Sequence, residues 1–399
     1  GTMKKSDLTG SVASVSADQL LKAPVSGLDQ ALQGRAAGVT VTSSSGQPGE
    51  GATIRIRGIG SALGGNDPLY VVDGVITGDI KWLSPTDIKS MEILKDASAA
   101  AIYGSRGANG VILITTKSGG KGKANVTFDA YWGLQNRWKK LDLMGSKEMA
   151  ETKLRIGTMR DGAAEMAYYN QNGFNEWMSV YNLGTSKYFP VPMTIANPDG
   201  LDYSSINTDW QDEVFHPNAF MHNYNLSVDG GGEKGHYAFS ASYFGQEGTI
   251  IGSDYQRFTL RLNSDVQLFK WLTIGEHLSF VHSSGRNAMN NSSSPGASVI
   301  SAALAMAPWD PTHYPEGSVN AQGEDISGRT AASSNFKNVT NPFSMVNESY
   351  PLDKTNRWVG DIYLEIKPVE GLTIRPSISM DTYLTNHRLF KNQYEYSTF

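Results

Sequence analysis

The chain has 399 residues, with 34 basic and 39 acidic side chains and a formal net charge of -5 at pH 7. This balance argues against a nucleic-acid-binding face, and the lack of cysteine excludes disulfides and thiol chemistry from this sequence. The 42 glycines and 18 tyrosines favour many turns and aromatic strand positions. No apolar run approaches the roughly 18 residues of a membrane-spanning helix, whereas a β-barrel would span with strands.

Residues 1–120 have the pattern of a mixed α/β unit. A helix is predicted from about residue 26 to 33, because Leu28, Ala31 and Leu32 share one face and Gly34 can end it. The strand "VTVT" follows. The next segment, "GATIRIRG", alternates isoleucine with arginine, which predicts a half-buried strand with one cationic face.

The second half of this unit contains further short elements. The segment "DPLYVVDGV" is predicted as a strand with a tight turn at Asp73 and Gly74. A helix start at "SPTD" precedes a strand over residues 91–94, and a short helix over 98–103 is ended by Gly104. The apolar strand "GVILITTK" and the glycine-rich hinge "SGGKGK" then lead to a region with a different period.

Residues 121–399 alternate apolar with polar or charged residues, as in "KANVTFDAYW" and "RFTLRLNSDVQLF". This period of two predicts strands with one apolar face. The strands are joined alternately by short turns, "GGGEKG", "KW" and "PVEG", and by longer segments at about 137–220, 247–253 and 284–354. A sandwich in water would also alternate, but short turns at one rim and long loops at the other are typical of outer-membrane barrels. Aromatic residues that would suit the membrane interfaces are Trp132, Tyr255, Trp271, Trp358 and Tyr383.

Three segments in the first unit carry a family resemblance: "LQGRAAGVTVTSSSGQPGEGATIRIRG", "PLYVVDGV" and "IKSMEILKDASAAAIYGSRGANGVILITTK". In this order they resemble the plug domain of TonB-dependent outer-membrane transporters, specifically the SusC-like (SusC/RagA) branch of Bacteroidetes. The resemblance implies a mainly β protein. An α/β plug at residues 1–120 would fill a transmembrane antiparallel β-barrel of about 22 strands. Residues 121–399 would hold about seven of them, with long extracellular loops at 137–220 and 284–354.

The resemblance also implies a function. It implies TonB-dependent active import of a nutrient, a glycan or an oligopeptide, across the outer membrane, without enzymatic activity or a cofactor. The implied partners are a SusD-like surface lipoprotein, TonB with ExbB and ExbD, membrane lipid and the rest of the same barrel. The resemblance also implies a further assembly, a dimer of transporter–lipoprotein pairs. The alternatives are a passive outer-membrane channel, an adhesin barrel, and a soluble carbohydrate-binding β-protein.

Two arginines are candidates for locking the plug in place. The resemblance implies that Arg57, in "IRG", binds acidic residues of the barrel wall in the missing C-terminal part, and Arg55 shares its strand face. A solvent-exposed cationic strand face is the alternative interpretation. Many family members carry Arg-Gly-Pro after the strand that corresponds to residues 91–94. Lys95, Asp96 and Ala97 stand there in this chain, and this departure from the family pattern argues against a second arginine lock at that position.

A glycine-containing loop at residues 58–68 is the candidate for ligand contact at the top of the plug. Its polar side chains Ser61, Asn66 and Asp67 are the hydrogen-bonding candidates.

Other chemistry is not supported by the sequence. The glycines of "GIGSALGG" do not fit a dinucleotide fingerprint, the seven histidines lack metal-ligand spacing, and no G-x-S-x-G elbow surrounds a serine. No catalytic residue and no metal ligand is therefore predicted. Because no leader precedes the first strand, we expect this sequence to be a part of a longer precursor.

Overall fold

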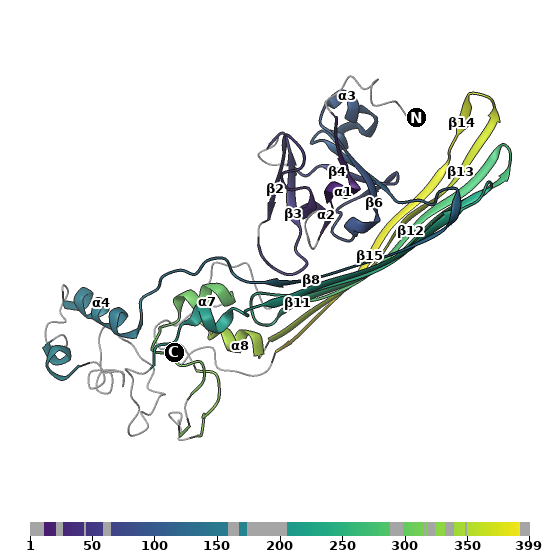
Figure 1. The fold of residues 1–399 in the computed structure, drawn as a ribbon. Coiled ribbons are helices and arrows are strands. Elements are labelled where there is room, and N and C mark those ends of the chain that lie inside the picture. Colours follow the sequence, from purple (N-terminus) through teal and green to yellow (C-terminus); the bar gives the residue numbers. More distant parts are fainter. Residues whose placement is uncertain are drawn as a thin grey trace.

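The computed structural model describes residues 12–20, 27–43, 45–58, 65–158, 167–173, 206–287, 298–314, 316–317, 324–331, 339–347 and 349–391. Two units share this chain: an N-terminal unit with strands β1 to β7, and a larger antiparallel sheet with strands β8 to β15, which we call the wall sheet. The N-terminal unit lies against one face of the wall sheet (Figure 1). Among the described residues, none of the helices is long and apolar enough to cross a membrane.

The N-terminal unit is built on a five-stranded sheet with the strand order β1-β6-β7-β4-β5. Its one parallel pair is β4 with β7, and a separate hairpin of β2 and β3 packs beside it. The strands are β1 (Val12–Ser16), β2 (Val39–Ser43), β3 (Ala52–Ile56), β4 (Leu69–Val72), β5 (Val75–Thr77), β6 (Ile88–Leu94) and β7 (Val111–Thr116). The short helices are α1 (Ala17–Leu20), α2 (Leu28–Ala31), η2 (Pro85–Asp87), α3 (Ala97–Ala100) and η3 (Ala101–Gly107).

In this unit the sequence predicts the type of each element better than its length. The predicted helix over 26–33 is reduced to the single turn α2. The predicted turn is present, because Asp73 and Gly74 both have positive φ (49° and 94°), as a tight turn between β4 and β5 requires. The predicted helix over 98–103 extends as η3 to Gly107, with Gly104 at φ 59° and ψ -146° marking a kink inside it.

The core of the N-terminal unit continues into the wall sheet. Its fully buried side chains come from α1, α2, β3, β6 and β7, and include Leu20, Leu28, Leu32, Ile54, Met91, Ile93 and Ile112. Val281 and Val359 of the wall sheet belong to the same cluster and are 3% and 4% exposed. The two units therefore share one hydrophobic core, and burial of this apolar surface holds them together.

The wall sheet is an antiparallel meander with the order β14-β13-β12-β11-β10-β9-β8, and β15 also pairs with β13. Because β14 and β15 both pair with β13, they act as one interrupted strand, and the sheet makes the seven crossings that the sequence predicts. The strands are β8 (Gly122–Gln135), β9 (Ala219–Gly231), β10 (Gly235–Glu247), β11 (Ser253–Phe269), β12 (Leu272–Asn287), β13 (Ser349–Val369), β14 (Leu372–Ile374) and β15 (Ser377–Lys391).

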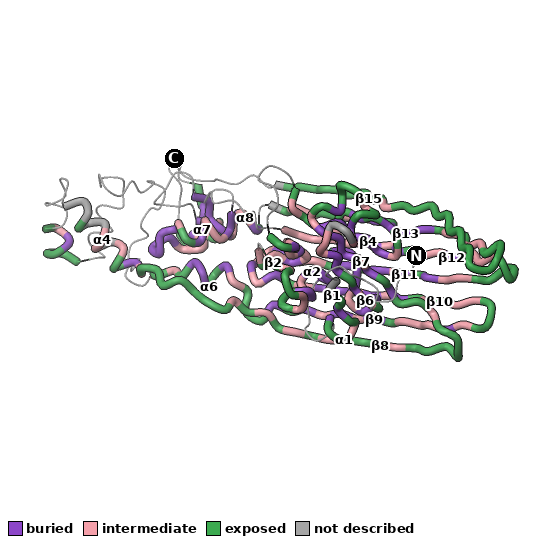
Figure 2. Tube along the Cα trace, turned by 90° about the horizontal axis from the view of Figure 1, so that it is seen from above, coloured by how far each residue is buried: buried purple, intermediate pink, exposed green. Residues whose placement is uncertain are grey.

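Short and long connections lie at opposite ends of the wall sheet. The hairpin turns after β9, β11 and β13 lie at one end, and α4 (Ser146–Thr158), α7 (Val299–Ala305) and α8 (Pro342–Asn347) lie beyond the other (Figure 1). The second long connection is shorter than the predicted segment 284–354, because the ladder between β12 and β13 continues to the pair Arg286 and Leu352. Figure 2 shows that the hairpin end is mostly exposed.

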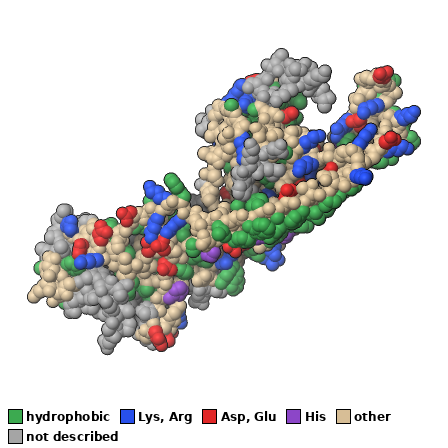
Figure 3. Space-filling model, viewed as in Figure 1, with side chains coloured by type: hydrophobic (Ala, Val, Ile, Leu, Met, Phe, Trp, Pro, Cys, Tyr) green, Lys and Arg blue, Asp and Glu red, His purple; other side chains and the backbone are tan. Residues whose placement is uncertain are grey.

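The two faces of the wall sheet differ in chemistry. On β11, Phe258 and Leu262 are 37% and 39% exposed, whereas Arg257 and Arg261 on the opposite face are 4% and 5% exposed. Hydrophobic side chains accordingly line the outer side of the sheet (Figure 3). The charged face is the one that the N-terminal unit covers, which is the pattern of a barrel wall with lipid outside and a filled lumen inside.

The long connections form a small layer of their own. Helices α6 (Trp210–Val214), α7 and α8 pack together around Trp210, Val299, Ala303 and Met306, which are at most 5% exposed. The apolar segment "VISAALAMAPW" is thus largely buried within this layer.

Candidate functional site

The most buried ion pair in the interface joins the wall sheet to the β4–β5 turn. Arg261 on β11 donates to the Asp73 carboxylate, and their side chains are 5% and 6% exposed. Asp73 also accepts hydrogen bonds from the Thr116 backbone N–H at 2.9 Å and hydroxyl at 2.6 Å. The guanidinium has two further partners, the hydroxyls of Ser279 at 3.0 Å and Thr116 at 2.7 Å. The left-handed turn at Asp73 is what directs this carboxylate toward the wall.

A second arginine makes a similar contact on β13. Arg357 binds Asp381 of β15 through two hydrogen bonds, Nε to Oδ1 at 2.9 Å and Nη2 to Oδ2 at 2.8 Å. The same guanidinium donates to Asp79 at 2.7 Å and to the Thr77 hydroxyl at 2.7 Å, both in the N-terminal unit. It also lies 5.5 Å from the Trp82 ring centroid. Arg357 therefore clamps the segment after β5 while being held in place by its own sheet.

A third acidic side chain faces the wall near these arginines. Asp87, at the end of η2, is 4% exposed. Its carboxyl group interacts electrostatically with Arg261 and Arg257 and forms a hydrogen bond with the Ser240 side chain of β10. Burial raises the pKa of Asp87 above its ordinary value, and the nearby arginines and the hydrogen bond oppose that rise. Arg257 itself donates to the backbone carbonyl of Lys81.

The chain leaves the N-terminal unit along the same wall. Asn263 on β11 donates to the Thr116 hydroxyl at 2.8 Å and to the Lys117 carbonyl at 2.7 Å, at the end of β7. Gly119 then passes so close to the wall that an added Cβ would lie 2.3 Å from the Tyr237 carbonyl oxygen. The hinge predicted from "SGGKGK" is thus held against β9 and β10 at this point.

Contacts continue near the ends of β10 and β11 at the rim where the long connections lie. The Gly49 N–H donates to the Gln246 side chain at 3.2 Å, and Gly49 lies against the Tyr255 ring. A Cβ at Gly49 would lie 2.4 Å from that ring, and its φ of 71° also favours glycine. The N-terminal unit is therefore bound along most of the length of these strands.

The two arginines predicted as locks have partners inside the N-terminal unit. Arg57 leaves β3 with a positive φ of 59° and pairs with Asp96, which precedes α3. Its side chain is 55% exposed. The Nη1 atom of Arg55 lies 3.8 Å from the Oδ1 atom of Asp67. A contact of either arginine with barrel strands outside this chain stays a prediction.

The candidate loop for ligand contact is described only in part. Ser61 lies outside the described residues. Asp67 is exposed and faces Arg55, and Asn66 is half-buried beside it. The Asn109 side chain donates to the carbonyl of Gly65 at 2.8 Å, which ties this end of the loop to the segment before β7. A role in ligand contact stays a prediction.

The sequence interpretation missed the residues that make the interface. The alternating pattern of the sequence predicts one charged strand face that contains Arg257 and Arg261, and Asp73-Gly74 predicts a turn. Nothing local indicated that the wall supplies the arginines and the N-terminal unit the carboxylates, because Arg261 and Asp73 are separated by 188 positions. Within the described residues, no group of three or more acidic or histidine side chains could hold a metal ion.

Comparisons with known proteins agree with this architecture. Residues 4–111 match the family model of the TonB-dependent Receptor Plug Domain. The chain is 35% identical over 389 residues to TonB-dependent receptor P26 of Formosa agariphila, covering 96% of this chain and 34% of the relative. It is 31% identical to TonB-dependent receptor SusC of Bacteroides thetaiotaomicron, over 92% of this chain and 34% of SusC.

Solved structures show the same fold. The RagAB peptide importer in its closed-closed state aligns with a TM-score of 0.76 at 25% identity, over 98% of this chain and 43% of that chain. The chain therefore belongs to the TonB-dependent receptors, and its relatives include SusC-like members. It is a mainly β protein of the outer membrane whose N-terminal unit is the plug. It spans about a third of the length of the curated relatives it matches.

Proposed function

We propose that the complete protein imports a nutrient across the outer membrane by a TonB-dependent, energised mechanism. In this proposal residues 1–120 are the plug and residues 121–399 begin a barrel of about 22 strands, whose long connections are extracellular. The protein performs no catalysis. The family of its relatives and the plug bound to the wall sheet support this function.

The observation that carries the proposal is the set of contacts between wall arginines and plug carboxylates. Arg261 with Asp73, and Arg357 with Asp79, fix the plug against the wall through charge-assisted hydrogen bonds. A lumen closed by a folded, bound plug offers no open path, so passage of a large nutrient requires work on the plug. In TonB-dependent uptake that work comes from TonB and its ExbB and ExbD partners at the inner membrane.

Conductance separates this function from that of a passive channel. The full-length protein in planar bilayers should conduct poorly, and deletion of residues 1–117 should open a large pore. Uptake of cargo by cells should also stop when the proton gradient is collapsed. Equal conductance of both proteins, or uptake that survives an uncoupler, would favour the passive channel.

A SusD-like lipoprotein is the proposed partner on the extracellular side. The segment after β8 carries an exposed apolar strip, in which Trp138 is 96% exposed and Leu143 and Met144 are 48% and 46% exposed. Leu143 and Met144 border a pocket of about 290 Å³ that Leu304 and Met306 of the loop layer complete. A solvent-facing surface of this kind suits a protein partner.

The partner is tested by purification from the native membrane in mild detergent. A lipoprotein should copurify in equal amount, and the double variant Leu143→Ser/Met144→Ser should lose it. The control Trp271→Ser removes an exposed aromatic side chain from the opposite rim and should keep the partner. A transporter that is recovered alone and takes up cargo at full affinity would argue against the lipoprotein.

The proposed cargo is an oligosaccharide or an oligopeptide. RagAB is a peptide importer, whereas P26 and SusC are named as TonB-dependent receptors, without a cargo in their names. Uptake measured with a defined oligopeptide mixture and a defined glycan mixture would distinguish these two classes.

A further inference from the structure

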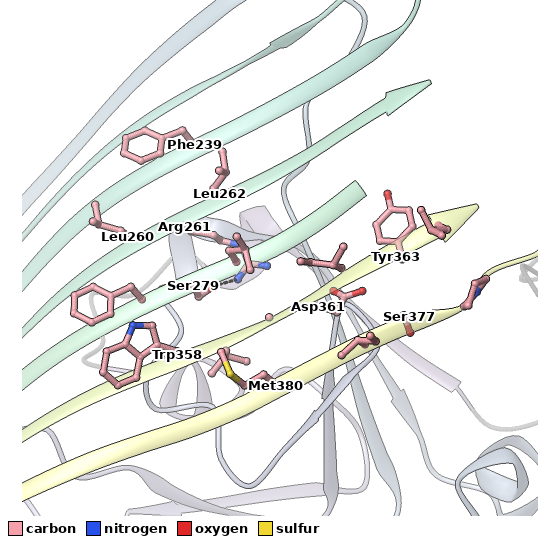
Figure 4. A pocket seen from close by; sticks show the side chains of 18 residues that line it. Phe239, Leu260, Arg261, Leu262, Ser279, Trp358, Asp361, Tyr363, Ser377 and Met380 are labelled. Carbon is pink, nitrogen blue, oxygen red and sulfur yellow. Dashed lines mark hydrogen bonds between the residues drawn. The ribbon is translucent and has the colours of Figure 1, made fainter. Parts of the chain in front are cut away.

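The outer face of the wall sheet contains a groove that the proposed import does not use. It has a volume of about 760 Å³ and lies on the face opposite the plug. Figure 4 shows that its walls come from neighbouring strands of the sheet. The main apolar side chains are Phe239, Leu260, Leu278, Trp358, Ile362 and Met380.

A glycine forms the floor of this groove. Gly360 lies between Trp358 and Ile362 on the outward face of β13, because side chains alternate along a strand. An added Cβ would lie 2.2 Å from the His277 carbonyl oxygen and 3.0 Å from a methyl group of Leu278. Gly360 has no room for a side chain, while its neighbours in the groove have large ones. This difference leaves a recess in the lipid-facing surface.

The strand register places cations beyond the groove, toward the rim with the long connections. Arg286 and Arg388 both pair with Leu352, from the strands on either side of it. Lys354 follows on the same outward face, two positions before Asn356 and four before Trp358. Lys354 and Arg388 are exposed. Three basic side chains, Arg286, Lys354 and Arg388, therefore lie four to eight positions beyond the groove residues on their strands, and we call them the basic patch.

One member of the basic patch is held in a fixed position. Arg286 donates to the Val346 carbonyl at 2.5 Å and lies 4.9 Å from the Tyr350 ring centroid. Asp254 of β11 pairs in register with Arg286, and Glu247 of β10 pairs with Asp254, so both carboxylates lie on the β11 side of the patch, away from Lys354 and Arg388. The patch on β12, β13 and β15 consequently presents positive charge between the apolar groove and the rim with the long connections.

We propose that the groove and the basic patch bind one phosphate-bearing lipid of the membrane. An acyl chain lies in the groove over Gly360, and the phosphate binds Lys354, Arg388 and Arg286. Basic side chains at a membrane surface attract anionic headgroups, and arginine matches the geometry of phosphate. In the orientation proposed above, this lipid belongs to the outer leaflet. The proposal does not depend on which nutrient is imported.

The test uses the full-length protein, stripped of lipid in detergent and mixed with diphosphorylated lipid A. Native mass spectrometry measures the retained lipid. The variant Lys354→Gln/Arg388→Gln should bind this lipid about tenfold or more weakly, since each basic residue near a headgroup contributes appreciably to binding. The control Lys234→Gln/Lys270→Gln removes two charges from the exposed hairpin turns at the other rim and should bind lipid A as the unmodified protein does.

Two further probes separate the parts of the site. Dephosphorylated lipid A should bind weakly to the unmodified protein and should not distinguish the two variants. Inorganic phosphate alone should not be retained, because the groove contributes through the acyl chain. Equal retention of lipid A by both variants, no preference for the phosphorylated lipid, or retention of free phosphate would overturn the proposal.

Discussion

Single side chains decide how the plug is held against the wall. Arg261 and Asp73 are almost fully buried, so neither charge has water as a substitute partner. Arg57 and Asp96 also form an ion pair, but the Arg57 side chain is 55% exposed, and exposed pairs contribute little to stability. Burial, more than the presence of an ion pair, therefore identifies the residues that matter for retention of the plug.

The Arg261→Gln variant tests this distinction. It leaves Asp73 buried with only the Thr116 donors, and breaking a buried pair in this way should cost about 3–5 kcal/mol of plug stability. Protease cleavage of the plug as a function of urea measures the loss in the full-length protein. The double variant Asp73→Asn/Arg261→Gln should be less destabilised than Arg261→Gln, because no unpaired charge remains. Strictly additive losses would contradict the pairing.

Asp87 should make plug stability depend on pH. Its pKa is raised by burial, so the protonated carboxyl favours the docked plug. This contribution is complete below the ordinary pKa of 3.8 and is lost as the pH rises through the raised value. We expect Asp87→Asn to unfold at higher urea than the unmodified protein at about pH 7, with the difference vanishing at about pH 3. A variant that is less stable at neutral pH would show that the Asp87 charge is fully compensated by Arg257 and Arg261.

The end of strand β7 and the hinge that follows it are held by specific contacts with the wall sheet. Strand β7 ends where Thr116 and Lys117 meet Asn263, and the following hinge lies against the β9–β10 hairpin. Glycine composition alone suggested a flexible connection. The close approach of Gly119 to two backbone carbonyls, those of Tyr237 and Gly230, shows that this glycine serves tight packing.

Neighbouring glycines in the hinge provide a matched comparison. An alanine Cβ at Gly119 would lie 2.3 Å and 2.4 Å from two carbonyl oxygens, whereas one at Gly120 would meet nothing within 4 Å. Gly119→Ala should therefore displace the hinge at a cost of about 1–3 kcal/mol, and trypsin should cut faster at the flanking Lys117 and Lys121. Gly120→Ala should be cut at the unmodified rate. Identical cleavage of both variants would show that the hinge is not held by this contact.

The whole molecule is an open sheet with a plug on its inner face. Strands β8 and β15 lie at its two edges, and their neighbours are not among the described residues. In the barrel proposed above, further strands pair with both edges, because unpaired backbone groups cannot face lipid. The order of short and long connections around the sheet then determines the orientation of the whole protein.

Labelling of single cysteines tests this orientation, because the chain contains no cysteine of its own. Asp325 lies exposed in the long connection between β12 and β13, and Glu233 lies exposed in the β9–β10 turn. On intact cells, an impermeant maleimide should label Asp325→Cys at once and Glu233→Cys only after lysis. The reverse result would invert the topology and place the long connections in the periplasm.

The candidate interface could be predicted from the sequence only in part. The alternation around Arg257 and Arg261 showed a charged face, and the Asp73–Gly74 turn was clear from two residues. Arg55 and Arg57 attracted attention because they belong to a recognisable motif, yet Arg261 and Arg357 carry the observed contacts with the plug. Their partners lie 188 and 280 positions away along the chain, beyond the range of any local pattern.

The sequence by itself determined the class of the protein, the two units and the sheet with one apolar and one charged face. Period, turn residues and the plug motifs are local features, and local backbone preferences translate them directly into elements. Only the tertiary structure decided which charges meet, that the 299–309 segment packs inside the loop layer, and that Gly360 leaves a groove. These depend on how the strands align in register and on how the plug fits against the wall, where burial and hydrogen bonding act between residues that are far apart in the chain.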